Sequence, residues 1–255
     1  MTARLDHAAM RRLSDQARAA LIAPRHGPDV CADCFNLTRG YQRCYACEAG
    51  EQRLAAVVPI SYSLAGEPLH CALAAYKREA DPSVPEATAW LAAILWRFLE
   101  RHEPCIATAA GTSDFELVTT VPSGARARDA RHPLRRIAGE LVAPTRERHE
   151  RLLERTRNPV VPRRFDPARF AATRRFRGEA ILLIDDTWTS GASAQSAAAA
   201  LRGAGSGPVA AVVIARYLNP GWHENSGRLR PRRGAFQFDT CPLCAPAAAA
   251  RAAAA

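Results

Sequence analysis

Lysine is almost missing from this sequence of 255 residues, in which Lys77 stands against 34 arginines. The 35 basic residues outnumber the 25 acidic ones, so the formal net charge is +10 at pH 7. An arginine bias is typical of GC-rich coding, but arginine is also the side chain that binds phosphate oxygens in a bidentate manner. The composition therefore leaves open whether the charge reflects a polyanionic ligand or the genome.

Long apolar runs are missing as well. A membrane-spanning helix needs roughly 18 or more apolar residues, whereas the best candidate, 87–99, is interrupted and then followed by charges. The first 23 residues mix charged and apolar side chains, which predicts an amphipathic helix and not a secretory signal. We therefore expect a cytoplasmic protein without a membrane partner. The whole sequence is 48% hydrophobic and 24% charged, which is typical of a globular chain.

Cysteine is the residue that stands out, because six of the eight cysteines form three Cys-x-x-Cys pairs. The first pair is Cys31 and Cys34, and nine residues separate it from the second, Cys44 and Cys47. Each pair places two thiolates on one tight turn, and two such turns complete a tetrahedral Zn²⁺ site. We predict a structural zinc ribbon over residues 29–52, with disulfides or free thiols as the alternatives.

The remaining cysteines are harder to place. Cys241 and Cys244 either join one of the earlier pairs in space, bind a second ion with other partners, or form a solvent-exposed turn; we favour a position near the N-terminal ribbon. Cys71 and Cys105 have apolar neighbours and are expected to pack as small hydrophobic residues.

Apolar periodicity outlines an α/β protein. It predicts helices at 1–23, 67–77, 85–101, 131–142 and 193–201, and strands at 54–62, 115–122, 180–184 and 209–215. The strand, helix and strand after residue 180 predict a βαβ unit and a parallel sheet. Residues 143–177 are rich in arginine and proline without clear periodicity, which is typical of a mobile functional loop.

The expected organisation has four parts. They are an N-terminal helical segment at 1–28, the zinc ribbon at 29–52, an α/β domain at 53–222, and a C-terminal extension at 223–255 with a Cys-x-x-Cys pair and a disordered Ala-rich tail.

The segment 181–193 carries the clearest chemistry. A short apolar run, typical of a strand buried on both faces, delivers Asp185 and Asp186 to the edge where open α/β sheets bind ligands. A loop of small and hydroxyl residues follows and opens a helix, so its backbone N–H groups suit a phosphate dianion. Because carboxylates accept hydrogen bonds from sugar hydroxyls, the ligand predicted from this pattern is a ribose 5-phosphate.

This segment closely resembles the phosphoribosyl pyrophosphate (PRPP) signature of type I phosphoribosyltransferases, in which two acidic residues precede a Thr-Ser-Gly-x-Ser loop. The resemblance implies that Asp185 and Asp186 hold the ribose 2- and 3-hydroxyls as the catalytic pair. It also implies that the following loop wraps the 5-phosphate, with PRPP-binding residues Thr187, Thr189, Ser190, Gly191, Ala192 and Ser193.

A wider resemblance covers roughly residues 31–220. The order of motifs is similar to that of the ComF family of competence-associated phosphoribosyltransferase-like proteins. These motifs are a cysteine ribbon, Tyr62-x-x-x-Gly66, a helix ending at Lys77 and a Val-Pro-Ser turn before the signature. The family fold implied is a parallel-sheet core with a small N-terminal zinc ribbon. The turn at 122–126 corresponds to the pyrophosphate loop, and its implied PRPP-binding residues are Ser123, Gly124 and Arg126. Lys77 is either a surface residue or part of the site.

The resemblance implies a phosphoribosyltransferase that uses Mg²⁺ with PRPP, transfers phosphoribose to an unidentified acceptor and releases pyrophosphate. Arg126, Arg174 and Arg175 are the arginines expected to close over the pyrophosphate. Thr189 stands where purine-salvage enzymes carry a carboxylate, which disfavours hypoxanthine-guanine salvage. Trp188 either stacks on a base or packs in the core.

A second function stays open. In it the chain only binds PRPP, and its zinc ribbon and basic surface contact nucleic acid or a DNA-processing protein. The sequence also leaves the oligomeric state open, with a dimer among the arrangements considered.

Overall fold

A four-stranded parallel sheet forms the centre of the structure, a computed structural model that describes residues 6–78, 82–123, 132–222, 225–229 and 236–245. The strand order is β1-β6-β5-β2, and all three neighbouring pairs are parallel. The strands are β1 (Ala56–Leu64), β2 (Leu117–Thr120), β5 (Ile181–Trp188) and β6 (Val209–Leu218). This confirms the predicted α/β class with a parallel sheet.

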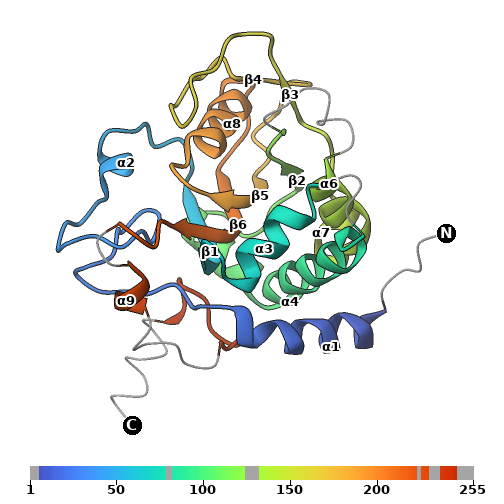
Figure 1. Cartoon of the computed structure of the whole chain (residues 1–255). Helices are drawn as coiled ribbons and strands as arrows, with labels where there is room; N and C mark the ends of the chain where they lie inside the picture. Colours follow the sequence, from blue (N-terminus) through green and yellow to red (C-terminus); the bar gives the residue numbers. More distant parts are fainter. Residues whose placement is uncertain (1–5, 79–81, 124–131, 223–224, 230–235, 246–255) are drawn as a thin grey trace.

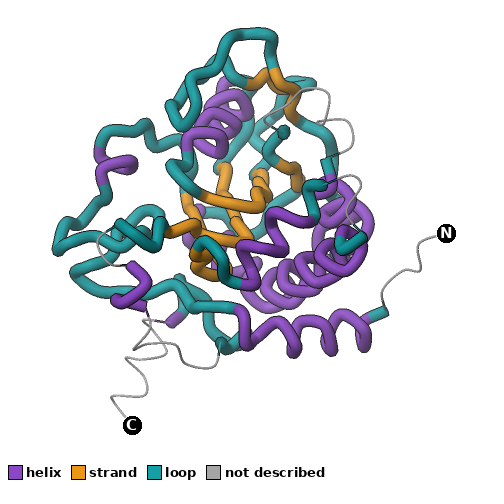
Figure 2. Tube along the Cα trace, in the orientation of Figure 1, coloured by secondary structure: helices purple, strands orange, loops and turns teal. Residues whose placement is uncertain are grey.

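Both faces of the sheet are covered by packed elements (Figures 1 and 2). On one face lie α3 (Pro68–Ala75), α4 (Val84–Ala110), α6 (Pro133–Arg136), the π-helical turn η2 (Ile137–Leu141) and α7 (Ala143–Arg146), with α1 (His7–Ala17) and the 3₁₀ turn η1 (Arg18–Ala20) outside them against α4. On the other lie α8 (Ala192–Gly203) and the antiparallel pair β3 (Leu153–Arg155) and β4 (Phe170–Ala172).

The apolar runs of the central strands explain this double cover. Successive strand residues point to opposite faces, so Val212 and Leu182 join the core under α4 while Val213 and Leu183 join the core under α8. All four side chains are fully buried. A strand with no polar alternation is stable only when both faces are covered.

Three sequence predictions need correction. Helix α4 does not end at residue 101: it runs through Pro104 to Ala110, because Ile106, Ala107 and Ala110 are buried in the core and outweigh the lost backbone hydrogen bond. Strand β5 does not end before the aspartates, because the long β6 continues to pair with it as far as Trp188. Residues 143–177 are not one long loop, since they contain α7, β3 and β4.

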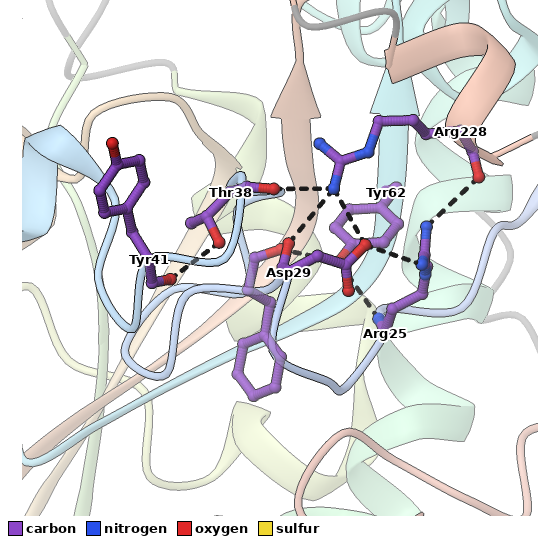
Figure 3. Close-up of polar contacts among 7 residues, drawn as sticks. Arg25, Asp29, Thr38, Tyr41, Tyr62 and Arg228 are labelled. Atoms are coloured by element: carbon purple, nitrogen blue, oxygen red, sulfur yellow. Dashed lines mark hydrogen bonds and ion pairs between the residues drawn. The ribbon is translucent and has the colours of Figure 1, made fainter.

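The cysteine-containing segment 29–52 lies beside the ends of β1 and β6 and contains one helical turn, α2 (Tyr45–Glu48). Figure 3 shows the polar contacts that hold the first part of this segment, around Asp29 and Thr38. The Tyr62 hydroxyl on β1 accepts from Arg25 N at 3.1 Å and donates to Phe35 O at 2.7 Å. Arg228 of α9 (Asn225–Leu229) donates to Asp29 Oδ2 at 2.9 Å. The segment is therefore held by buried and partly buried polar contacts with β1 and α9.

Some expectations fall on residues outside the described ranges: the start of the N-terminal helix at 1–5, and the Ala-rich tail at 246–255. The described helices are all too short or too polar to span a bilayer.

Candidate functional site

The candidate site lies at the carboxyl edge of β5. Because the strand continues to Trp188, the loop between β5 and α8 consists only of Thr189–Gly191. Gly191 caps the helix with φ 81°, a left-handed conformation that favours glycine. The first backbone N–H groups of α8 therefore point at this edge, where an anion is stabilised by them and by the helix dipole.

A hollow of about 330 Å³ gathers the predicted residues at this edge. Every predicted residue of the 185–193 segment lines it, namely Asp185, Asp186, Thr187, Thr189, Ser190, Gly191, Ala192 and Ser193, and Ser123 joins them from the end of β2. Gly124 and Arg126 lie outside the described residues. The lining also includes three cationic or titratable side chains: Lys77, His132 and Arg163.

Lys77 belongs to this site. Its Nζ lies 2.9 Å from Asp186 Oδ1, and the neighbouring Tyr76 hydroxyl donates to Asp186 Oδ2. Burial acts to raise the pKa of Asp186, but the Lys77 charge and the two hydrogen bonds outweigh it and hold that pKa below its ordinary value. Asp186 is thus an ionised, fixed acceptor, held by two residues that end the α3 segment.

Asp185 is in a different state. Its carboxyl is partly buried beside the charged Asp186, and desolvation and this neighbouring charge both raise the pKa of Asp185, to about 8. Its Oδ1 accepts from Asp186 N at 2.9 Å. Adjacent acids whose pKa values are pushed apart are typical of functional sites. Here one carboxylate is ionised and the other holds a proton near neutral pH.

A buried arginine supports the loop from the other side. Arg169 Nη1 donates to Ser193 Oγ at 2.8 Å, and Arg169 Nη2 donates to Arg164 O at 2.7 Å. Arg169 is only 5% exposed, and its hydrogen bond to Ser193 brings a buried positive charge to the first turn of α8. Sequence reasoning missed Arg169, because it is one of many arginines in a segment without periodicity.

Two arginines predicted at the site lie elsewhere. Arg174 stacks on Phe176 with 4.9 Å between its Cζ and the ring centroid, and it pairs with Glu150 and Glu179. Arg175 is its exposed neighbour, and neither residue lines the hollow. Arg174 is held away from the hollow by Phe176 and Glu179, which are close to it in the sequence, and by Glu150, 24 positions earlier.

Trp188 packs in the core and does not present its ring to a base. The side chain is 2% exposed and belongs to the core under α8. A Cβ atom built on Gly191 would lie 2.1 Å from Trp188 Cζ2. Position 191 therefore requires glycine for two reasons: a Cβ atom would overlap the indole ring, and the backbone is in the left-handed conformation.

A larger cleft of about 760 Å³ adjoins the hollow and shares five lining residues with it, namely Arg163, Trp188, Thr189, Ser190 and Ala192. Aromatic side chains line it, among them Tyr45, Phe165, Tyr217 and Trp222. Tyr45 and Trp222 are exposed, which is unusual for large apolar side chains. The cleft has the size and lining of a small-molecule site.

The four N-terminal cysteines come together as predicted. Cys31, Cys34, Cys44 and Cys47 are buried, and their sulfur atoms all lie within 4.8 Å of one another. Cys34 Sγ and Cys44 Sγ are 3.6 Å apart. In a tetrahedral zinc site with Zn–S bonds of about 2.3 Å, the sulfur atoms lie about 3.8 Å apart. The group can therefore hold a metal ion such as Zn²⁺.

Arg216 at the end of β6 connects this cluster with the loop. Its Nη1 donates to Trp188 O at 3.0 Å and to Thr189 O at 2.9 Å, while its Nη2 lies 3.8 Å from Cys34 Sγ. The side chain is 3% exposed. One buried side chain therefore contacts both the cysteine cluster and the loop.

The third cysteine pair forms a second group that can hold a metal, together with His102 and Cys105 of α4. Cys105 is half-buried and Cys71 is exposed, so the prediction of buried apolar packing is wrong for Cys71. Pro242 and Leu243, between the paired cysteines, also line a hollow with ribbon residues that include Cys31, which agrees with the expected position near the ribbon.

Comparison of the sequence with protein-family models and with curated proteins finds no match.

Proposed function

We propose that the carboxyl edge of this sheet binds PRPP with Mg²⁺, and that the chain is a phosphoribosyltransferase-like protein similar to the ComF family. The observation that carries the proposal is the hollow at this edge, because it combines an acidic pair, a hydroxyl-rich loop and a helix N-terminus within about 330 Å³. Each part has the chemistry that one part of PRPP requires.

The 5-phosphate would lie against the loop. The backbone N–H groups that open α8 and the hydroxyls of Thr189 and Ser190 supply donors, and the buried Arg169 behind Ser193 supplies positive charge. Since α8 is twelve residues long, its dipole adds to this attraction.

The ribose would lie over the acidic pair. Each oxygen of Asp186 is already bonded, by Tyr76 or Lys77, yet each keeps a second lone pair for a ligand hydroxyl. Asp185 accepts as well once it loses its proton, and its carboxylate is the protein oxygen best placed to contact Mg²⁺. The ion would take most of its other ligands from the phosphates and water, and would neutralise the charge of the leaving pyrophosphate.

The proposed reaction transfers phosphoribose. The bond between ribose C1 and the pyrophosphate oxygen breaks with its electron pair on pyrophosphate, and a lone pair of the acceptor forms the new bond to C1. The positive charge that develops on the sugar is stabilised by the nearby carboxylates. The adjoining aromatic cleft is where we place the acceptor. Thr189 offers no carboxylate to take a proton from a purine base.

The test is pyrophosphate release from Mg²⁺-PRPP, measured by a coupled assay with a panel of nucleobases and amines. We expect release that depends on one class of acceptor and that is lost in Asp186→Asn, whereas Asp114→Asn, an exposed carboxylate before β2, keeps it. PRPP binding without release for any acceptor would refute transfer and favour a PRPP-binding protein. No binding at all would refute the whole proposal.

A further inference from the structure

We propose that His102, Cys105, Cys241 and Cys244 bind a second Zn²⁺ ion, which fastens the C-terminal segment 236–245 to helix α4. The four ligand atoms lie within 4.8 Å of one another. They come from two parts of the chain that are up to 142 positions apart. The argument is independent of the proposed PRPP site.

Helix α4 supplies two of the ligands. His102 and Cys105 are three residues apart, so they lie on the same face of the helix. The other two come from the turn of Cys241 and Cys244, in which Cys244 N donates to Cys241 O at 3.2 Å and Ala245 N to the same oxygen at 2.9 Å. A Cys-x-x-Cys turn facing a helical pair offers a closed set of three thiolates and one imidazole, a common structural zinc set.

The distances fit a tetrahedral ion. His102 Nδ1 lies 3.8 Å from Cys105 Sγ and 3.9 Å from Cys244 Sγ. With Zn–S of about 2.3 Å and Zn–N of about 2.0–2.1 Å, the sulfur and nitrogen ligands of a tetrahedral site lie about 3.6 Å apart. The observed spacing is close to this value, so small side-chain shifts complete the site.

The hydrogen bond of His102 sets the correct tautomer for a metal ligand. Its Nε2 lies 2.8 Å from Phe238 O, and a carbonyl oxygen only accepts, so Nε2 carries the proton. The unprotonated Nδ1 then faces the two thiols. Metal-binding histidines typically donate their other ring N–H to such a carbonyl, which fixes the ring orientation.

The thiol turn is arranged for thiolates too. Cys241 N lies 3.1 Å from Cys244 Sγ, as a donor to the sulfur. Arg101 is 3.5 Å from Asp239, and Arg97 lies over the Phe238 ring with 4.8 Å between its Cζ and the ring centroid, so cations flank the segment.

An ion here would fix a segment that has little structure of its own. Residues 236–245 contain no strand and no complete helix among those described, yet Phe236 and Phe238 are buried in the core beside α4. Arg18 Nε holds Phe236 O at 2.9 Å. A short segment with few contacts of its own is ordered mainly by cross-links to the rest of the protein. A metal ion bound between this segment and α4 supplies such a cross-link.

The test is the zinc content of the full-length protein purified under reducing conditions. We expect two zinc ions per chain in the wild type and one in the double variant Cys241→Ser, Cys244→Ser. The matched control is Cys71→Ser, which removes an exposed thiol and keeps two ions. One ion in the wild type, or two in the double variant, would overturn the proposal.

A second measurement applies to the wild type alone and does not depend on the folding of a variant. Alkylation of the native zinc-loaded protein, read by mass spectrometry, should label Cys71 first and leave the other seven cysteines protected until a strong chelator is added. Rapid labelling of Cys241 and Cys244 before chelation, or a disulfide between them in the reduced preparation, would contradict a metal site.

Discussion

Adding one methyl group at Gly191 tests whether the loop of the candidate site is built around the Trp188 ring. In Gly191→Ala the new Cβ would meet three indole atoms, Cζ2, Cε2 and Cη2, at 2.1, 2.6 and 2.7 Å. Ordinary carbon contacts are about 3.5–4.0 Å. The ring is buried in the core, so the added methyl group forces the ring or the loop to shift.

Two separate effects determine how much unfolding free energy Gly191→Ala loses. The left-handed backbone, with φ 81°, costs an alanine about 1–2 kcal/mol. Forcing extra volume into a packed site costs about 1–3 kcal/mol more. Gly111 is the matched control, because it has φ 74° at the end of α4 and nothing within 4 Å of its Cβ position. Gly111→Ala should therefore show the backbone cost alone.

The assay is urea denaturation at a fixed zinc concentration, because metal binding changes the apparent stability. We expect Gly191→Ala to lose about 1–3 kcal/mol more than Gly111→Ala. The added loss should shrink in a Trp188→Phe background, where the distal indole atoms are removed. The reasoning would be refuted if Gly191→Ala and Gly111→Ala lost the same unfolding free energy, or if the loss from Gly191→Ala were unchanged in the Trp188→Phe background.

Three further outcomes are expected. The pKa of Asp185 is raised to about 8, so the folded protein holds a proton that the unfolded chain has released above about pH 4. Stability should therefore fall as the pH rises from about 4 to about 8, and in denaturation Asp185→Asn should be on the order of 5 kcal/mol more stable than the wild type at pH 8 but equal to it below pH 4. Arg216→Gln leaves three carbonyl acceptors without the guanidinium donor, so it should cost about 2–4 kcal/mol, against less than about 0.5 kcal/mol for the exposed Arg202→Gln by the same method. Cys34→Ser should lower the thermal midpoint by at least about 5 °C, and a chelator should lower it in the wild type but add little to the variant.

The local features of this protein were predictable from the sequence. The apolar runs of β5 and β6 predict buried strands, and the spacing of Cys31, Cys34, Cys44 and Cys47 predicts one cluster, because a Cys-x-x-Cys turn and a strand period are properties of a few consecutive residues.

Contacts between distant segments were not predictable in the same way. Lys77 pairs with Asp186 across 109 positions, and Arg169 reaches Ser193 from a segment without periodicity. His102 has an ordinary place on a helix, and only the fold brings it to Cys244. No local sequence pattern indicates such pairs, because the packing of the whole chain determines which distant residues come into contact.

Calorimetric titration of the full-length protein with PRPP in Mg²⁺ tests the central claim most directly. We expect saturable binding by the wild type and by the control Asp114→Asn, and an affinity at least about tenfold weaker in the double variant Asp185→Asn, Asp186→Asn, because the lost hydrogen bonds to charged acceptors are worth about 1.5–3 kcal/mol each. Absence of binding by the wild type, or equal affinity in the double variant, would contradict the assignment of this sheet edge to PRPP.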